Sequence, residues 1–253
     1  MNQNGGGFLS GIPPVTLNII VITVICWLAQ MLLGSRGIDV TNLLGLHYFA
    51  SDAFYPHQLI TYMFMHDTSN IMHLLFNMFA VYMFGRTLEM VWGPKRFLFY
   101  YIATGLGAAL LNMLVAYIRI QSVESGMSEE MIAEVYRNGL EILSNGKNYA
   151  DPQLGNLNLL INQVTVGASG AVFGILVAFG MFFPNAELMI IPIPIPIKAK
   201  YLVIGYGLLE VFLGVSNMEG DNVAHFAHVG GLIVGFFIVL YWKYQNKKHG
   251  RFY

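Results

Sequence analysis

Apolar residues along this chain gather in six runs that more polar segments separate. The runs cover residues 15–33, 70–88, 97–118, 169–183, 200–215 and 223–242. A helix of about 20 apolar residues crosses the hydrocarbon core of a bilayer, and these runs reach or approach that length. The pattern therefore predicts an all-α membrane protein built as a bundle of six transmembrane helices.

The composition places the chain in the same class. Hydrophobic residues form 56% of the 253 residues and charged residues only 11%, which is far from the balance of a soluble domain. The net charge of −1 gives no basic excess, so we expect the lipid bilayer and not nucleic acid as a partner. The single cysteine, Cys26, forms no intrachain disulfide and leaves the redox compartment open.

The runs also divide the chain into parts. Residues 1–14 contain no lysine or arginine, unlike a secretory signal or a mitochondrial presequence, and we expect a flexible cytoplasmic arm. Residues 15–242 are expected to form the six-helix domain, with an insertion on the outer face at about residues 119–166. Residues 243–253 are expected to form a basic cytoplasmic tail.

The positions of the basic residues predict the orientation, because lysine and arginine accumulate on the cytoplasmic side of a membrane. With the N-terminus inside, the inner segments hold Arg86, Lys95, Arg96, Lys198, Lys200, Lys243, Lys247, Lys248 and Arg251. The outer segments hold only Arg36, Arg119, Arg137 and Lys147. We therefore expect a multi-pass protein of a bacterial inner membrane with both termini in the cytoplasm.

Two connecting segments have patterns of their own. Five apolar residues of the insertion share one helical face: Ile132, Val135, Tyr136, Leu140 and Leu143. With Ser128 as N-cap they predict an amphipathic helix on the outer surface, either a surface addition or a lid over a substrate. Residues 191–197 alternate isoleucine and proline, and since proline donates no backbone hydrogen bond, we expect an extended inner connector there.

Counting residues places Ser169, at the start of the fourth run, in the membrane. From Ser169 to Pro184, which closes the run, the helix is about 22 Å long, and the hydrocarbon core is about 30 Å thick. Ser169 would then lie roughly 8 Å below the outer boundary. The same count from His228 to Lys243, at the inner end of the sixth run, gives the same depth.

Small residues at every fourth position let two of these helices pack closely. They are Gly170, Gly174 and Ala178 in the fourth run, and Ala227, Gly231 and Gly235 in the sixth. Close packing along these stripes would place Ser169 beside His228. A serine in a membrane helix commonly bonds its own backbone, but a histidine at membrane depth marks a functional site. The pair together favours a nucleophile and its base.

His73 and Asn77 lie four residues apart on one face of the second helix. Both side chains donate hydrogen bonds, as the stabilisation of an oxyanion in acyl transfer requires. An alternative is a pair of interhelical hydrogen bonds that only fix packing. The residues alone leave both interpretations open.

Four short motifs follow one another along the chain. They are HxxxN (His73, Asn77), GxxxExxxG (Gly85, Glu89, Gly93), G-x-S-G (Gly167, Ser169, Gly170) and AHxxGxxxG (Ala227, His228, Gly231, Gly235). With these motifs the chain resembles the rhomboid intramembrane serine proteases. The resemblance implies a rhomboid-like six-helix bundle in which Ser169 is the nucleophile and His228 the general base. It also implies that His73, Asn77 and the Ser169 amide stabilise the oxyanion.

The implied activity is that of a serine endopeptidase that cleaves single-pass membrane proteins near the outer face, without a cofactor. The fifth helix and the loop before the sixth would admit the substrate laterally. Gly167, Gly170 and His225 are expected to support the site. The motif fits His228 and not His225, because His225 would require glycine at position 228. Two departures from the family are His57-Gln58 in place of a common Trp-Arg pair, and the long outer insertion.

No acid lies next to His225 or His228 in the sixth run, so we expect a Ser–His dyad without an orienting aspartate. Glu210, in the fifth run, is expected to be a protonated, hydrogen-bonded structural carboxyl. The main alternative function is a catalytically inactive rhomboid-like binder of membrane clients. A metalloprotease is disfavoured, and no metal is expected, because no HExxH motif occurs. A transporter is disfavoured because its polar groups would lie at the midplane.

Overall fold

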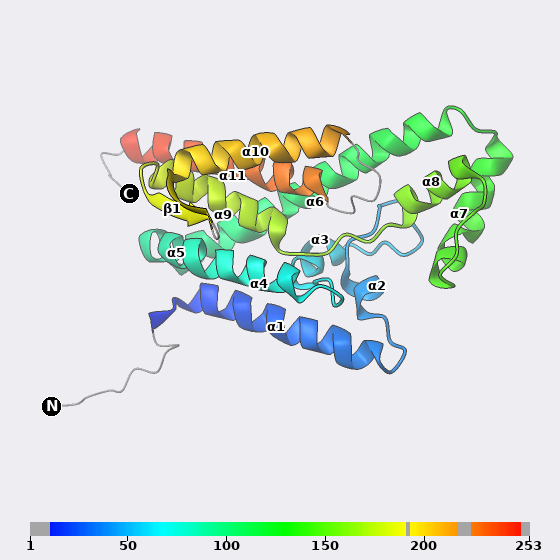
Figure 1. Cartoon of the computed structure of the whole chain (residues 1–253), viewed down its shortest axis with the longest axis horizontal. Coiled ribbons are helices and arrows are strands. Elements are labelled where there is room, and N and C mark those ends of the chain that lie inside the picture. The colour runs from blue at the N-terminus through cyan, green and yellow to red at the C-terminus, as the bar shows by residue number, and fades with distance from the viewer. Residues whose placement is uncertain (1–10, 191–192, 217–223, 249–253) are drawn as a thin grey trace.

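The protein is a bundle of helices that lie side by side (Figure 1). A computed structural model describes residues 11–190, 193–216 and 224–248. Most of the expected arm, the predicted start of the sixth helix at residue 223 and the tail from residue 249 lie outside these residues. Five helices are long and apolar enough to cross a membrane: Pro14–Gly34 (α1), Ile71–Trp92, Pro94–Glu124 (α6), Ala199–Ser216 (α10) and His225–Lys248 (α11).

The remaining predicted span, the fourth run of the sequence, is α9, Ser169–Phe182, and it begins at the residue that the sequence indicates. It is shorter than the others because it does not face lipid. Ten of its residues are buried, and it contacts α6, α10 and α11. A helix enclosed by protein need not match the thickness of the bilayer. The expected all-α bundle is therefore confirmed, with a short enclosed helix at its centre.

The run Ile71–Trp92 is not a uniform helix. It consists of α4 (Ile71–Ala80), a π-helical turn η3 (Val81–Gly85) and α5 (Arg86–Trp92). The Asn70 side chain caps α4 by accepting a hydrogen bond from the Met72 amide. The run ends at Gly93, which has φ 79° and so a backbone conformation that favours glycine. The π turn contacts both α1 and α9, where the extra residue adjusts the packing.

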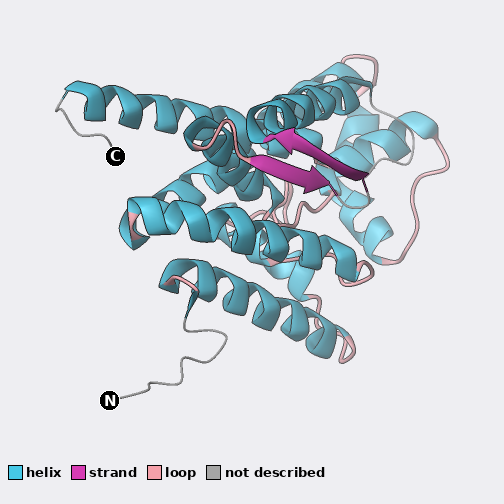
Figure 2. Ribbon diagram, turned by 60° about the vertical axis from the view of Figure 1, so that its left-hand side comes forward, coloured by secondary structure: helices cyan, strands magenta, loops and turns pink. Residues whose placement is uncertain are grey.

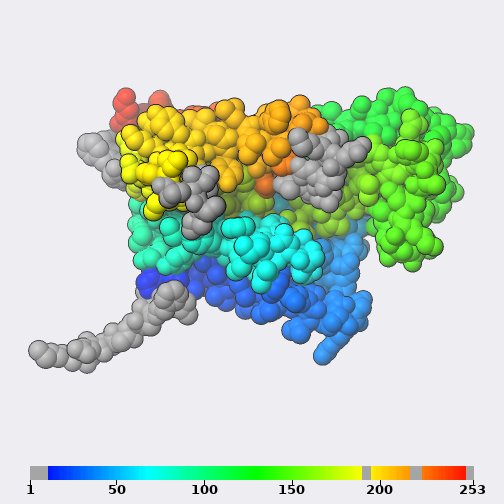
Figure 3. Space-filling view, viewed as in Figure 1, coloured from blue at the N-terminus to red at the C-terminus, as the bar shows by residue number. Residues whose placement is uncertain are grey.

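The insertion predicted at about residues 119–166 forms a separate lobe at one end of the bundle, opposite the end where α1 begins and α11 stops (Figures 1 and 3). α6 runs beyond its predicted end at residue 118 into this lobe. The predicted amphipathic helix is confirmed as α7, Glu129–Ser144, with the Ser128 side chain accepting from the Met131 amide. A further helix, α8 (Pro152–Asn162), was not predicted. α7 packs on α8 and α8 on α6, which gives the lobe a small core of its own.

The remaining elements are short. α2 (Val40–Leu44), α3 (Gln58–Thr61) and the 3₁₀ turn η2 (Tyr62–Phe64) occupy the loop between the first two spans. Of the expected connector at residues 191–197, residues 191–192 lie outside the described residues. The rest is extended, as expected, and also pairs with a second strand. β2 (Ile193–Lys198) runs antiparallel to β1 (Glu187–Ile190) in the hairpin between α9 and α10 (Figure 2). A two-stranded hairpin tolerates proline because each strand is an edge.

The two small-residue stripes meet as predicted. A Cβ atom added to Gly231 would lie 1.8 Å from the carbonyl oxygen of Gly170, and one on Gly235 would lie 3.1 Å from the Gly174 Cα. The Tyr100 hydroxyl of α6 donates to the Gly174 carbonyl at 2.7 Å and so links α6 to the same contact. α9 and α11 therefore approach backbone to backbone, and this brings their first turns together.

This contact gives the first testable expectation. Gly231→Ala should lower the free energy of unfolding by about 1–3 kcal/mol, because the methyl group overlaps backbone that cannot move away independently. Gly205→Ala is the matched control, since nothing lies within 4 Å of a Cβ there. Thermal unfolding in detergent measures both variants. Equal melting temperatures for the two would contradict the close approach.

Candidate active site

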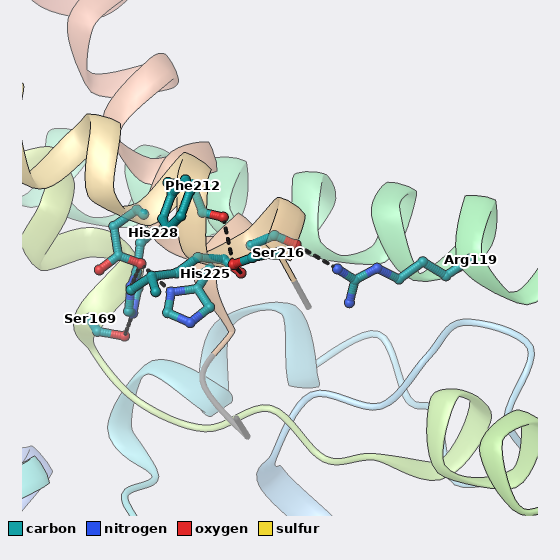
Figure 4. A network of polar contacts seen from close by, with 9 residues as sticks. Arg119, Ser169, Phe212, Ser216, His225 and His228 are labelled. Atoms are coloured by element: carbon teal, nitrogen blue, oxygen red, sulfur yellow. Dashed lines mark hydrogen bonds and ion pairs between the residues drawn. The ribbon is translucent and has the colours of Figure 1, made fainter. Parts of the chain in front are cut away.

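The site begins with the contact between α9 and α11. Ser169 is the first residue of α9, and His228 lies in the first turn of α11. The Ser169 Oγ and the His228 Nε2 are 2.8 Å apart, a hydrogen-bond distance (Figure 4). Ser169 is half-buried and His228 is 8% exposed. The structure thus joins a hydroxyl to an imidazole nitrogen in a mostly enclosed setting.

The backbone before Ser169 holds the serine in place. Gly167 has φ 125°, and its amide donates to the Tyr62 carbonyl at 3.0 Å. A Cβ at Gly167 would lie 2.9 Å from the His73 Nε2, so only glycine leaves room there. Gly170 is equally constrained, since its Cβ would lie 2.4 Å from that of Ala108. The first amides of α9 have no partner within the helix and are available as donors beside the serine.

His228 has two further neighbours. Its ring stacks on Phe173 of α9, with centroids 4.4 Å apart and an interplanar angle of 12°. Its Nδ1 lies 2.8 Å from the Oε2 of Glu210 on α10. The sequence analysis expected a dyad without an orienting aspartate, and the structure adds a glutamate contact from α10 to this histidine. A sequence scan for an acid beside His228 could not find Glu210, because α10 brings it from another helix.

His225 occupies the same cluster but a different position. Its Nδ1 lies 2.6 Å from the same Oε2 of Glu210, and its ring is nearly perpendicular to that of His228. The hydroxyl of Ser169 meets His228. The structure thus separates the two histidines as the motif does: one contacts the serine, and both contact the carboxylate.

The two expected oxyanion donors differ in placement. His73 is half-buried and lines the cavity that contains Ser169. The Asp67 amide lies 3.5 Å from its Nδ1. Asn77 is 6% exposed and its amide donates to the carbonyl of His73 at 2.9 Å, within its own helix. Among the described residues, those lining the cavity include His73 but not Asn77.

This cavity, of about 580 Å³, opens beside the serine. Its walls come from α4, the start of α9, the start of α11 and the loop segments before α4 and α9. The volume lies within the range of sites that enclose a ligand of a few residues. The site therefore has space for a short extended piece of polypeptide next to the hydroxyl.

His66 also lines the cavity, and sequence reasoning did not assign it to the site. It is fully buried, and neither ring nitrogen meets a hydrogen-bond partner among the described residues. Burial, with His73 close by, lowers the pKa of His66 to about 4, so this imidazole is neutral at physiological pH.

Gln58 shows what replaces the Trp-Arg pair of the family. Its side chain is fully buried at the start of α3. Its oxygen accepts from the amides of His47 and Tyr55, and its nitrogen donates to the carbonyls of Leu43 and Ala53. Gln58 therefore ties together the loop between the first two spans, which the sequence pattern alone did not indicate.

Arg119 links the lobe end of α6 to the helices around the site (Figure 4). Its guanidinium donates to the Gly214 carbonyl near the end of α10 at 2.7 Å and lies over the Phe226 ring of α11. The predicted outer insertion thus begins with a residue that contacts both helices bearing the Glu210–histidine cluster. α7 itself packs on α8, as a surface addition does.

Glu210, His225 and His228 each offer one possible metal ligand, with these atoms within 4.8 Å of one another. Ligand spacing along the sequence does not identify this cluster, because the carboxylate comes from another helix. Two hydrogen bonds to one carboxylate oxygen also account for the cluster. Both histidines are satisfied in this way without a metal.

The spans and this site define a multi-pass integral membrane protein with a serine–histidine pair set in a cavity. The chain matches the Rhomboid domain family over residues 53–245. This match covers most of the chain and shows that the protein belongs to the rhomboid family.

Two curated relatives are similar to the chain. RHOMBOID-like protein 12, mitochondrial, of Arabidopsis thaliana is 28% identical over 181 residues, which cover 70% of this chain and 44% of the relative. Rhomboid protease AarA of Providencia stuartii is 28% identical over 171 residues, which cover 66% of this chain and 50% of the relative. The chain thus spans about half the length of these relatives.

Proposed function

We propose that the protein is an intramembrane serine endopeptidase. The observation that carries the proposal is the 2.8 Å contact between the Ser169 Oγ and the His228 Nε2 beside a cavity. Membership of the rhomboid family and the similarity to a relative named as a rhomboid protease support it. A serine hydroxyl becomes an effective nucleophile when a neighbouring base accepts its proton.

The reaction uses Ser169 and His228 in two stages. The Ser169 oxygen attacks the carbonyl carbon of the scissile bond while its proton passes to the His228 Nε2. The carbonyl oxygen becomes an oxyanion, which the first amides of α9 and the His73 ring stabilise. His228 then gives its proton to the leaving amine, and the acyl-enzyme forms. Water entering through the cavity gives a proton to His228 as its oxygen attacks the ester carbonyl. His228 then returns that proton to the Ser169 oxygen as the ester bond breaks, which releases the acid and restores the hydroxyl.

Asn77 does not point a free donor at the site in the unbound protein. Its amide donates to the carbonyl of His73, so in the free protein it holds the turn of α4 that carries His73. To contact the oxyanion directly, Asn77 would have to exchange that bond for one to the substrate. The free-enzyme geometry of such donors commonly tightens only in the complex with substrate.

The proposed substrates are single-pass membrane proteins cut near the outer face of the bilayer. Peptide carbonyls in a helix are hydrogen-bonded, so a substrate must unwind locally before Ser169 can reach one. The cavity has room for such an extended piece. Lateral entry past α10 rests on the resemblance to the family, and the loop before α11, which it also names, lies outside the described residues. We place the protein in a bacterial inner membrane with both termini in the cytoplasm, on the distribution of basic residues.

Purified full-length protein in proteoliposomes tests this function with a substrate that contains one transmembrane segment. Wild type should cleave it and be labelled by a fluorophosphonate, while Ser169→Ala should do neither and keep its melting temperature. EDTA should leave cleavage unchanged, whereas a metalloprotease would lose it. Cleavage by Ser169→Ala would refute the role of the serine. Equal substrate binding by both proteins without cleavage by either would indicate the inactive binder.

A further inference from the structure

Glu210 is a buried acidic residue on α10, a helix that is otherwise mostly exposed. Most residues of this helix are exposed to the lipid side, and its buried residues are Ala199, Glu210 and Gly214. Glu210 is 7% exposed, and its Oε2 contacts the Nδ1 atoms of both His225 and His228. A carboxyl in the interior of a membrane protein is expensive unless it has partners and a use.

The contact determines where the proton of a neutral His228 lies. A carboxylate oxygen only accepts hydrogen bonds, so the Nδ1 that meets it carries a hydrogen. A neutral imidazole has one N–H, and the Nε2 is then left with its lone pair. That lone pair is 2.8 Å from the Ser169 Oγ. Glu210 thus selects the tautomer that can accept the proton of the serine.

We propose that Glu210 is a positioning residue that holds His228 in its proton-accepting tautomer and stabilises the imidazolium formed during catalysis. This inference rests on the proposed protease function. It extends the expected dyad to a Ser169–His228–Glu210 triad, in which the third residue comes from α10 and does not itself take the proton. The order of contacts, hydroxyl to imidazole to carboxylate, is that of a serine hydrolase triad.

The surroundings of His228 leave this role to Glu210. Ser169 and Phe173 of α9 contact the ring, and neither carries a charge. His73 faces it across the cavity from α4, and His225 shares its helix; both are basic and would not stabilise a second positive charge. Among the described residues, Glu210 is the carboxylate in contact with His228, and in a poorly solvated site such a charge acts strongly.

His225 has a supporting part in the cluster. Its Nδ1 meets the same Oε2, which restricts the carboxylate to the direction that also serves His228. Asparagine at position 225 places an amide N–H close to where the histidine Nδ1 lies. His225→Asn therefore keeps a donor to Glu210 and is the matched control for a change at Glu210 itself.

The experiment compares Glu210→Gln, His225→Asn, Ser169→Ala and wild type as full-length protein in proteoliposomes. Glutamine keeps the size of the side chain but has no charge, and its amide can donate to Nδ1 and select the wrong tautomer. We expect Glu210→Gln to lower kcat by about 10²–10⁴-fold with little change in KM. His225→Asn should lose less than about tenfold. Melting temperatures report on folding.

A kcat of Glu210→Gln within threefold of wild type would overturn the proposal. An equal fall for Glu210→Gln and His225→Asn, accompanied by lower melting temperatures, would also overturn it, because it would show a structural tie between α10 and α11. If Glu210→Gln fails to fold, ¹⁵N NMR of histidine in the wild type decides: a proton on the His228 Nδ1 supports the proposal, and one on Nε2 refutes it. Inactive wild type, or active Ser169→Ala, would refute the protease function instead.

Discussion

Replacing His228 with asparagine is expected to lower kcat at least about 10³-fold, while the protein stays folded. Asparagine can still donate a hydrogen bond to the Glu210 Oε2 from near the Nδ1 position, so the contact between α10 and α11 survives. It offers nothing at the Nε2 position, where the Ser169 hydroxyl now finds its acceptor at 2.8 Å. The variant therefore removes the base and little else.

Cleavage of a substrate with one transmembrane segment, measured under single-turnover conditions, provides the comparison. His57→Asn is the control, because His57 is exposed and is not among the residues that line the cavity. Its Nε2 lies 3.1 Å from the Leu43 carbonyl of α2, and its ring stacks on Tyr55. This variant should cleave at the wild-type rate. Fluorophosphonate labelling of Ser169 should slow in parallel with cleavage in His228→Asn. Activity within tenfold of wild type would show that another group accepts the proton of the serine.

The helices of this protein could be predicted because their apolar runs are continuous. The ends of the helices are harder to predict where a helix leaves the bilayer. Polar residues there can either continue the helix in water or end it. α6 extends into the outer lobe for that reason, and α8 was missed because its polar sequence has no strong apolar period. The π turn inside Ile71–Trp92 has no sequence signature among apolar residues.

The approach of Ser169 to His228 was predictable for a physical reason. Both lie at helix ends that the sequence analysis places on the outer side, a fixed number of residues from marked inner ends, and small residues on each helix permit close contact. Equal depth in the membrane and close packing of the two helices together restrict the distance between the Ser169 and His228 side chains. The same reasoning had no means of placing Glu210, since the face that α10 turns toward α11 depends on the packing of the whole bundle.

The site also shows which sequence arguments fail within a membrane bundle. A search for an acid near a histidine in sequence, or for metal ligands at fixed spacing, considers one helix at a time. Here one carboxylate from α10 serves two histidines of α11. Gln58 is a similar case. It stands where the family commonly has arginine, yet its side chain is buried and hydrogen-bonded to several backbone groups of the loop. The partners of Glu210 lie on another helix, and those of Gln58 lie in a segment without a regular hydrophobic period.

Glu89→Ala is expected to have the largest effect on stability, a loss of about 3–5 kcal/mol. Glu89 is 2% exposed on α5 and accepts hydrogen bonds from the amides of Val15 and Thr16 and from the Thr16 hydroxyl, at 2.7–2.9 Å. These amides belong to the first turn of α1, whose donors have no partner within the helix. The carboxylate also interacts favourably with the positive end of the helix dipole.

Removing that carboxylate leaves several donors buried without a partner at the point where α1 joins the bundle, so we expect α1 to detach before the other helices unfold. Thermal unfolding in detergent, together with hydrogen exchange of the α1 amides, measures both effects. Glu89→Gln should lose less stability, since its oxygen still accepts. Glu187→Ala, at an exposed position in β1, should melt like the wild type. If Glu89→Ala also melts at the wild-type temperature, the bonds to α1 contribute little to stability, because the bilayer-facing packing of that helix holds it in place without them.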